Sequence, residues 1–459
     1  MIETKNSLTY YVVIAMLCLV PIVYWKEYLG PIPISIEIIL IPLLVLAAAY
    51  DYWKKNIQLN TFPVMPILIA FISFFVASLL SLIKAEYMAP AIMEILRFLS
   101  YVFLFTIVVK VKFSKEQYFT FAKVFGATAL LIGFFGIIQY VFDISLNKAG
   151  LYALQEAKGR VDGTLENPNY FSSFLNYVIP TLVLLSVVYF QQKKWQFLYF
   201  GFFAIYVINL IFTYTRAAWV TMFCAFFLTI LFMPKRFLKG FFKPHMLIAF
   251  TVLIVSVYFM PDVQSRTNSA IYAMQKLVFP NWEVAAPEEP GEEGEDPEDQ
   301  EQDKEDETTE RAVVSRTTLW KTGWFMFRDN PILGVGIGNY YDRYSDFTDK
   351  YPELYIGHET YSVHNSYLKV MAEGGTIGIL TFMSIYVIFF LYILRLFFKQ
   401  PDLKGKVIAA GLFVGSTTFM VQNLSNNLMF IPRLNVVFWL VGALALAFLY
   451  LNQKQFKDA

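Results

Sequence analysis

Long apolar runs alternate with short polar segments along most of this chain. A membrane-crossing helix needs about 20 mostly apolar residues to cover ~30 Å of hydrocarbon, and the chain offers about twelve such runs. The predicted runs are 8–25, 31–50, 62–83, 89–109, 118–141, 168–190, 195–213, 217–233, 246–260, 374–397, 405–424 and 433–451. The pattern therefore predicts an all-α polytopic membrane protein.

One polar segment is much longer than the others and divides the chain. Residues 1–260 are predicted to hold transmembrane helices 1 to 9, and residues 374–459 helices 10 to 12. Between them, residues 261–373 form one large loop outside the membrane. A shorter loop of the same side covers residues 142–167.

The large loop changes character along its length. Residues 283–310 are acidic and poor in apolar residues, so they cannot bury enough surface to offset chain entropy. We expect this insertion to be disordered and to have no catalytic role. The following aromatic residues recur at helical spacing and predict an amphipathic helix near 314–330 that lies on the outer membrane surface.

Composition supports the membrane assignment. The chain is 57% hydrophobic and 16% charged, whereas soluble domains are roughly 45–50% apolar and 25% charged. Cys18 and Cys224 fall inside predicted spans and indicate neither a disulfide nor a metal framework. We expect no cofactor and no nucleic-acid partner.

Basic residues are concentrated in one set of short loops. This set contains Lys54, Lys55, Lys110, Lys112, Lys115, Lys193, Lys194, Lys235, Arg236, Lys239, Lys243, Arg395, Lys399, Lys404 and Lys406. By the positive-inside rule these loops and both termini are cytoplasmic, and the large loop is extracytoplasmic. The first apolar run has no small-residue cleavage site after it, so we expect a retained helix.

Three ionisable residues stand out on the outer side. His364 lies before a long apolar run, where the simplest interpretation is that Asn365 or Ser366 caps a helix and the imidazole bonds to backbone. Arg216 and Arg316 each lie at the edge of an apolar or aromatic stretch. Such cations snorkel to headgroups, or they are paired or face water.

The position of Arg216 and Arg316 on the predicted outer side of the membrane favours a role in ligand binding. Positive-inside statistics disfavour arginine on the outer face, and the guanidinium fork suits bidentate phosphate binding.

Near the sixth run, Asn167 is the expected helix cap and Pro168 the first helical residue. That assignment leaves Arg160 and Asn169 at the outer surface, where they can join the same site.

Three other charged residues in or near the apolar runs have an ambiguous role. Glu94 and Arg97 are three residues apart on one helix face. They form either a buried ion pair or part of the wall of a polar cavity. Arg433 at the start of the last run is equally ambiguous.

Two further motifs do not indicate ligand chemistry. HETYSVH, residues 358–364, lacks the H-E-x-x-H spacing, and its histidines would lie about 240° apart on a helix. We therefore reject a zinc site. GVGIG, residues 334–338, follows no predicted strand and is a weak nucleotide signal. A flexible turn that brings backbone close to a ligand or to the membrane surface fits better.

Four segments together resemble the bacterial O-antigen ligase and polysaccharide polymerase family. They are GRVDGTLENPNYF, TYTRAAW, RTTLWKTGWFMFRDNPILGVGIGNYY and VHNSYLKVMAEGGTIG. The resemblance covers about residues 90–430, and HN-x-Y-L followed by E-x-G-x-x-G is its most specific part. The acidic residues 283–310 look like an insertion relative to the usual outer loop.

The resemblance implies a GT-C-like, metal-independent glycosyltransferase fold with the active site outside the cytoplasmic membrane. The donor would be a glycan on undecaprenyl diphosphate, and the acceptor a glycan or lipid-linked glycan. His364 corresponds to the proposed general base, and Arg216 and Arg316 to arginines proposed to bind the diphosphate. Arg160, Asn169 and Asn365 are further substrate-binding candidates.

The residues favour a membrane transferase, either a cell-surface polysaccharide polymerase or an O-antigen-ligase-like enzyme with inverting chemistry. A transporter or flippase of lipid-linked saccharides is the alternative, for which ionisable groups near mid-membrane, such as Glu94 and Arg97, are typical. A scaffold for envelope assembly that docks through residues 283–310 is a third hypothesis.

Overall fold

The computed structural model describes residues 7–29, 32–144, 160–260, 263, 316–357 and 359–455. The acidic insertion 283–310 and His358 lie outside these described residues, as do the predictions that concern them.

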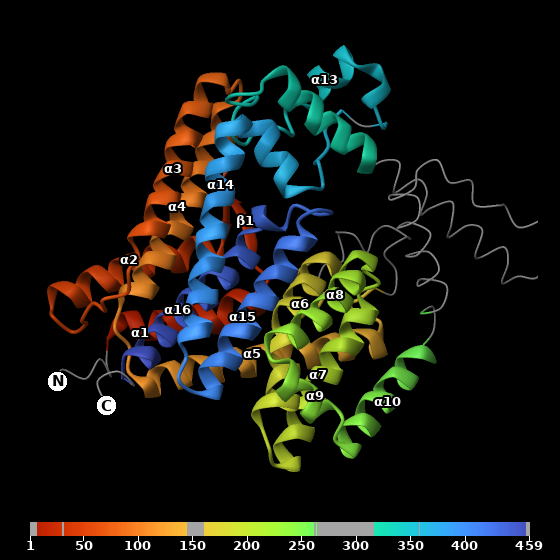
Figure 1. Cartoon of the computed structure of the whole chain (residues 1–459). Coiled ribbons are helices and arrows are strands. Elements are labelled where there is room, and N and C mark those ends of the chain that lie inside the picture. The colour runs from red at the N-terminus through yellow and green to blue at the C-terminus, as the bar shows by residue number, and fades with distance from the viewer. Residues whose placement is uncertain are drawn as a thin grey trace, which may run out of the picture.

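A helix lies at each predicted apolar run (Figure 1). These helices are α1 (Leu8–Ile22), α2 (Ile36–Trp53), α3 (Met65–Ser81), α4 (Met88–Lys110), α5 (Lys115–Phe142), α6 (Pro168–Leu184), α7 (Lys193–Phe212), α8 (Arg216–Phe232), α10 (Pro244–Tyr258), α14 (Ser366–Lys399), α15 (Leu403–Gln422) and α16 (Pro432–Gln455). Shorter elements are α9 (Pro234–Phe241), α13 (Tyr344–Lys350), η2 (Leu82–Lys84), η5 (Leu185–Tyr189), η6 (Pro352–Leu354) and η7 (Leu428–Phe430).

Among the described helices, 8 are long and apolar enough to cross a membrane, or 9 if α8 and α9, bent by 112°, form one span. The chain is thus a multi-pass membrane protein. The expected twelve spans exceed this number, because α1, α10 and α15 fall outside the group. Both α1 and α10 have 15 residues, and such a helix rises only about 22 Å.

A β-hairpin connects α1 to α2 in a structure whose other described elements are helical, so the all-α expectation holds for the bundle. Strands β1 (Lys26–Leu29) and β2 (Ile32–Ser35) pair antiparallel, with Lys26 opposite Ser35. The apolar run predicted at 31–50 therefore becomes helical only at Ile36. Pro33 fits this late start, because proline is unfavourable in a helix interior and is tolerated in an edge strand.

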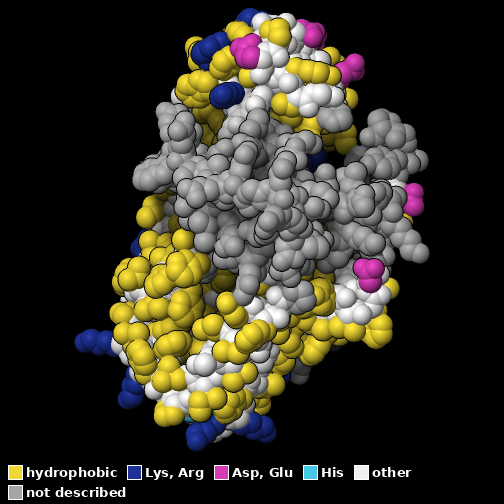
Figure 2. All heavy atoms as spheres, turned by 90° about the vertical axis from the view of Figure 1, so that its right-hand side faces the viewer, with side chains coloured by type: hydrophobic (Ala, Val, Ile, Leu, Met, Phe, Trp, Pro, Cys, Tyr) yellow, Lys and Arg dark blue, Asp and Glu magenta, His cyan; other side chains and the backbone are white. Residues whose placement is uncertain are grey.

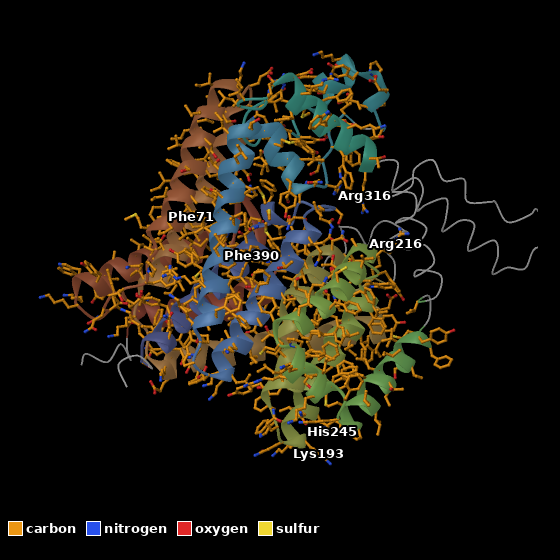
Figure 3. All side chains as sticks on the ribbon, in the orientation of Figure 1. Phe71, Lys193, Arg216, His245, Arg316 and Phe390 are labelled. Carbon is orange, nitrogen blue, oxygen red and sulfur yellow. The ribbon has the colours of Figure 1, made fainter. Side chains whose placement is uncertain are left out.

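Basic loops from distant parts of the chain meet at one end of the bundle. Lys454 Nζ donates to Thr61 Oγ1 at 2.6 Å, and Lys110 Nζ donates to the Phe62 carbonyl at 3.4 Å. Lys193 lies at the same end in Figure 3, and Figure 2 shows Lys and Arg side chains below a band of apolar ones. We call this the basic end.

The opposite end carries a small folded unit (described residues 316–357 and 359–374), which we call the outer domain after the side of the membrane that the sequence predicts for it. It begins with a helix at 316–329. Leu319, Thr322, Gly323 and Met326 form the buried stripe of this helix, and Leu319 and Met326 pack in a core with Tyr344. The predicted aromatic face is a different one, and Trp324 on it is 49% exposed, so its contact with a membrane surface stays a prediction.

A kink at Gly375 separates the outer domain from the membrane part of α14. Gly375 has φ 63° and ψ −160°, and a Cβ there would lie 2.3 Å from the Ile332 backbone. Just before it, the Ala372 carbonyl accepts the Val335 N–H at 2.9 Å. Residues 366–374 therefore belong structurally to the outer domain.

The glycine-rich turn at 334–338 also packs on the protein itself. Gly336 has φ 106°, and a Cβ there would lie 2.5 Å from the Ala85 Cα. Nearby, the Ser81 hydroxyl accepts the Ile337 N–H at 2.8 Å. The close backbone approach that the sequence indicated is thus to the loop after α3, rather than to a ligand or the membrane surface.

Close packing of α15 against α6 and α8 fixes the helices that carry candidate site residues. A Cβ at Gly415 would lie 2.2 Å from the Tyr177 carbonyl oxygen, a closeness that small residues permit between membrane helices. One turn away, Thr418 Oγ1 donates to the Asn176 carbonyl at 3.1 Å, and Asn176 Nδ2 donates to the Ala218 carbonyl at 3.0 Å. These bonds hold α6, α8 and α15 in one arrangement.

Candidate functional site

His364 occupies a fixed but unusual backbone position just before α14. Its φ is 50°, a left-handed conformation in which histidine is enriched among non-glycine residues. Val363 before it is fully buried in the outer-domain core. After it, the Ser366 Oγ donates to Asn423 Oδ1 at 2.6 Å. The loop is therefore anchored on both sides of the histidine.

Asn365 is the N-cap of α14. Its side-chain oxygen accepts the N–H groups of Tyr367 and Leu368, both at 3.0 Å. The simplest interpretation from the sequence thus accounts for Asn365, whose substrate-binding role stays a prediction. It does not account for the imidazole of His364, for which no hydrogen bond occurs among the described residues. The Tyr361 ring lies beside it, with 6.4 Å between ring centroids.

Arg316 lies close to His364 and changes its acidity. Burial, and to a smaller extent the positive charge of Arg316, together lower the pKa of His364 to about 4. The sequence predicted that the arginines keep this histidine neutral. Burial is the larger cause of its low pKa, and of the two arginines only Arg316 contributes. Arg316 itself is exposed, while the surrounding protein lowers its pKa.

Trp320, four residues after Arg316, was not singled out as a ligand-binding residue in the sequence. Its indole N–H is buried and has no acceptor in the described structure, and its ring packs against the outer-domain core. A buried donor without a partner is costly, so it is available to an acceptor that enters beside Arg316. The aromatic spacing of this helix was the only signal in the sequence.

A second group of candidate residues lies where α6 and α8 begin. Thr215, the N-cap residue of α8, accepts from Arg160 Nη2 and donates to Asn169 Oδ1, both at 3.3 Å. Arg160 Nε also donates to the Thr213 carbonyl at 2.9 Å. Arg216 is the first residue of α8. The structure therefore brings together Arg160, Asn169 and Arg216, as the sequence suggested.

The same backbone feature occurs at three helix starts. A left-handed residue directly precedes the N-cap of α6, α8 and α14. The pairs are Glu166 (φ 70°) with Asn167, Tyr214 (φ 47°) with Thr215, and His364 (φ 50°) with Asn365. All three helix N-termini lie at the outer-domain end, where their partial positive charge favours anions.

Helix α15 links the two groups of residues. It packs against α6 and α8, and Asn423 at its end accepts the Ser366 N–H at 2.9 Å. In Figure 3, Arg316 projects from the outer domain toward the end of the bundle, and Arg216 lies at the end of α8 below it. Both arginines are thus directed toward the region between the outer domain and the membrane helices.

Glu94 and Arg97 form an ion pair at 3.0 Å. Arg97 Nη1 also donates to the Phe430 carbonyl at 3.1 Å. Together they line a cavity of about 30 Å3, which has room for a water molecule or two. The structure therefore supports the ion-pair interpretation, and the small cavity beside the pair is lined mostly by apolar residues.

Arg433 is buried and is held by backbone carbonyls and a carboxylate. Its side chain is 5% exposed, and its guanidinium donates to the carbonyls of Thr164 at 2.7 Å and Val23 at 2.8 Å. It also lies 3.4 Å from a Glu166 carboxylate oxygen. Arg433 thus ties the start of α16 to the ends of two loops.

Glu373 is a buried acidic residue whose importance the sequence indicated only through the E-x-G-x-x-G motif. It is fully buried, forms an ion pair with Lys369, and its Oε1 accepts the Tyr340 N–H at 3.0 Å. Lys369 also lies 4.6 Å from the Phe430 ring centroid. Glu373 therefore joins α14 to the outer domain.

Metal ligation finds no support in the part of the chain that the structure describes. No group of three His, Cys, Asp or Glu side chains there is placed to hold a metal ion. The first histidine of the rejected zinc motif, His358, lies outside the described residues.

Comparison with known proteins finds one family model that matches part of the chain. Residues 201–383 match the family model of O-Antigen ligase, which confirms the resemblance seen in the motifs. The matched range includes Arg216, Arg316 and His364, whereas Arg160 and Asn169 precede it.

A curated relative is similar over a shorter stretch. The teichuronic acid biosynthesis protein TuaE of Bacillus subtilis (strain 168) is 28% identical over 116 residues. The aligned part covers 24% of this chain and 22% of TuaE, so the match spans about a fifth of the relative's length.

Proposed function

We propose, from the O-Antigen ligase match and the site geometry, that this protein is a metal-independent membrane glycosyltransferase with a GT-C-like fold. It moves a glycan from an undecaprenyl-diphosphate-linked donor to a hydroxyl group of an acceptor glycan or lipid-linked glycan. The feature that carries this proposal is His364, a largely enclosed imidazole whose pKa is lowered by burial and by the positive charge of Arg316. The outer-domain end faces the exterior of the cytoplasmic membrane, and both termini face the cytoplasm.

The reaction needs few groups, because a glycosyl diphosphate already carries a good leaving group. A bond forms between the acceptor oxygen and the anomeric carbon, while the bond from that carbon to the diphosphate oxygen breaks. The acceptor proton passes to His364, and the diphosphate departs with the bonding electron pair. Attack opposite the leaving group inverts the anomeric configuration.

Charge stabilisation is assigned to the arginines and helix ends. Arg316, with the buried Trp320 indole N–H nearby, supplies donors next to His364. Arg216, at the beginning of α8, and Arg160, bonded to Thr215, add cations where the N-termini of α6 and α8 meet. Preorganised cations and dipoles of this kind stabilise developing negative charge.

The low pKa of His364 has a consequence for the order of events. At pH 7 the imidazole is neutral, but a group with a pKa of about 4 is a weak base. A bound diphosphate offsets the charge of Arg316 and so raises the pKa of His364. The histidine therefore becomes a competent base once the donor is bound.

The transporter alternative depends on Glu94 and Arg97. Since these residues neutralise each other and border a cavity of only about 30 Å3, they support transport less than the outer group of residues supports transfer. The scaffold alternative depends on residues 283–310. Deletion of this segment leaves transfer activity intact if the transferase proposal holds, and abolishes function if the segment is a docking surface.

The decisive experiment uses purified protein in lipid nanodiscs with an undecaprenyl-diphosphate glycan donor. We expect His364→Ala to lower product formation by about 10²–10⁴-fold, the usual contribution of a general base. His245→Ala is the matched control, because His245 lies at the basic end and bonds to Gln196. Equal donor turnover by wild type and His364→Ala overturns the base assignment. Analysis of glycan length distinguishes a polymerase from a ligase.

A further inference from the structure

The described helices border a second, much larger cavity, far from His364. Its volume is about 690 Å3, within the roughly 300–1,000 Å3 of small-molecule pockets. Helices α5, α6, α7, α15 and α16 line it. The lining residues of α5 and α15 run from Tyr118 to Leu130 and from Lys404 to Leu412, which is the half of each helix nearest the basic end. This cavity is therefore at the opposite end from the candidate site.

The walls of the cavity are suited to hydrocarbon. Most lining residues are apolar, among them Phe125, Leu182 and Val441. A Cβ added at Gly126, which also lines the cavity, would meet no atom within 4 Å. Apolar cavities of this kind do not hold ordered water. Inside a membrane protein, the available occupant is a lipid chain.

Two lysines line the same cavity. Lys123 lies eight residues after Lys115, the first residue of α5, and so about 12 Å along the helix. It is exposed, and no ion pair or hydrogen bond to it occurs among the described residues. Lys404, on the facing helix α15, has its Nζ 4.2 Å from the Phe119 ring centroid. A cation this far inside a span requires an anion or water.

We propose that this cavity binds one anionic phospholipid from the leaflet at the basic end. An acyl chain occupies the apolar cavity, and the phosphate is held by Lys123 and Lys404. Basic pockets between transmembrane helices commonly bind anionic headgroups in this way, and the flexible lysine stems allow both amines to reach the headgroup depth. The positive charges of Lys123 and Lys404 favour an anionic over a zwitterionic lipid.

The bound lipid has a structural role that follows from its neighbours. It fills the space between α5, α6 and α7 on one side and α15 and α16 on the other. Since α6 and α15 also fix the outer ends that carry the candidate site, the lipid stabilises the same packing from the basic end. This proposal does not depend on the proposed transferase activity, and its test measures binding and stability only.

The test uses delipidated, detergent-solubilised full-length protein and two probes, phosphatidylglycerol and phosphatidylcholine. Native mass spectrometry counts bound lipids, and tryptophan fluorescence gives the unfolding temperature. We expect one tightly retained phosphatidylglycerol and a higher unfolding temperature with it than with phosphatidylcholine, because a ligand of the folded state stabilises it.

Two pairs of variants make the test specific. Lys123→Gln combined with Lys404→Gln should remove the preference for phosphatidylglycerol, whereas Lys406→Gln, on the same helix but outside the lining, should keep it. Gly126→Phe should block retention of either lipid. Gly201→Phe is its control, since a Cβ there also meets nothing within 4 Å and Gly201 does not line the cavity.

Several outcomes would overturn the proposal. Equal shifts by the two lipids in wild type exclude a headgroup site, and a phosphatidylglycerol preference retained by the double lysine variant excludes these lysines. Displacement of phosphatidylglycerol by undecaprenyl phosphate, equally in wild type and in the double lysine variant, identifies the cavity as a site for polyprenyl chains instead. If Gly126→Phe does not fold, the lysine variants decide the question alone.

Discussion

Arg316 lowers the pKa of His364, although the two residues come from opposite ends of the outer-domain sequence. Arg316 begins the helix at 316–329, and His364 directly precedes the cap of α14. Their proximity combines a neutral proton acceptor with a fixed cation. That combination suits transfer from an anionic donor, and it makes the acidity of His364 measurable evidence for the site.

The pH dependence follows from the direction of this pKa. Because His364 accepts a proton, it is active above its pKa, so kcat/KM should stay level from neutral pH down to about pH 5 and fall as the pH approaches 4. Arg316→Gln removes one of two causes that lower the pKa. The acid limb, and the imidazole NMR titration of His364, should then move to higher pH. A shift to lower pH, or none, contradicts the assigned proximity.

The fork of Arg316 can be tested separately from its charge. Arg316→Lys keeps the positive charge but loses the planar donor pair, so we expect about a 10–100-fold loss of kcat/KM, the equivalent of one charge-assisted hydrogen bond. Arg328→Lys is the control. It lies on the same helix, where its guanidinium packs 4.2 Å from the Phe325 ring centroid. Undiminished activity of Arg316→Lys argues against bidentate phosphate binding.

Asn365 allows the cap and the substrate-binding interpretations to be distinguished. Asn365→Ala removes the acceptor of two backbone N–H groups and should cost about 1 kcal/mol of stability, with reduced activity because His364 is adjacent. Asn365→Asp keeps a good capping oxygen. Normal stability and activity in Asn365→Asp support a positioning role, whereas normal stability with lost activity supports contact with substrate. Thermal unfolding and transfer assays give both readouts.

Gly415 should be intolerant of a side chain. Gly415→Ala places a Cβ 2.2 Å from the Tyr177 carbonyl, so α6 and α15 must separate, at a cost of about 1–3 kcal/mol. Gly201→Ala is the matched control, because its Cβ meets nothing within 4 Å and alanine favours helix by up to about 1 kcal/mol. Unfolding temperatures in detergent should therefore shift in opposite directions. Equal shifts contradict the close helix contact.

Several features could be predicted from sequence because they depend on local properties. Apolar runs located the candidate membrane spans of the described residues, since crossing hydrocarbon demands a continuous stretch of apolar residues. Polar residues at the ends of those runs identified both groups of candidate residues. The cap at Asn167 followed from its residue type, and its side chain does accept the Asn169 N–H. The motifs also indicated the family that residues 201–383 match.

Other expectations failed where a periodic pattern does not specify its partner. The sequence correctly predicted an amphipathic helix near 314–330, but it did not show that a second face of this helix is covered by protein. Leu319 and Met326 pack on the domain's own core. Likewise, the glycines at 334–338 indicated close backbone approach, and only the fold shows that Ala85 and Glu373 are the neighbours.

The sequence by itself determined where the helices lie, which end of the bundle is basic, and which polar side chains lie at the other end. Tertiary structure decided their pairing: Arg316 with His364, and Arg160 with Thr215 and Asn169. Hydrophobicity is a property of each segment alone, so it can be read along the chain. Proximity between distant side chains, and the burial that keeps His364 neutral, depend on how the helices pack together.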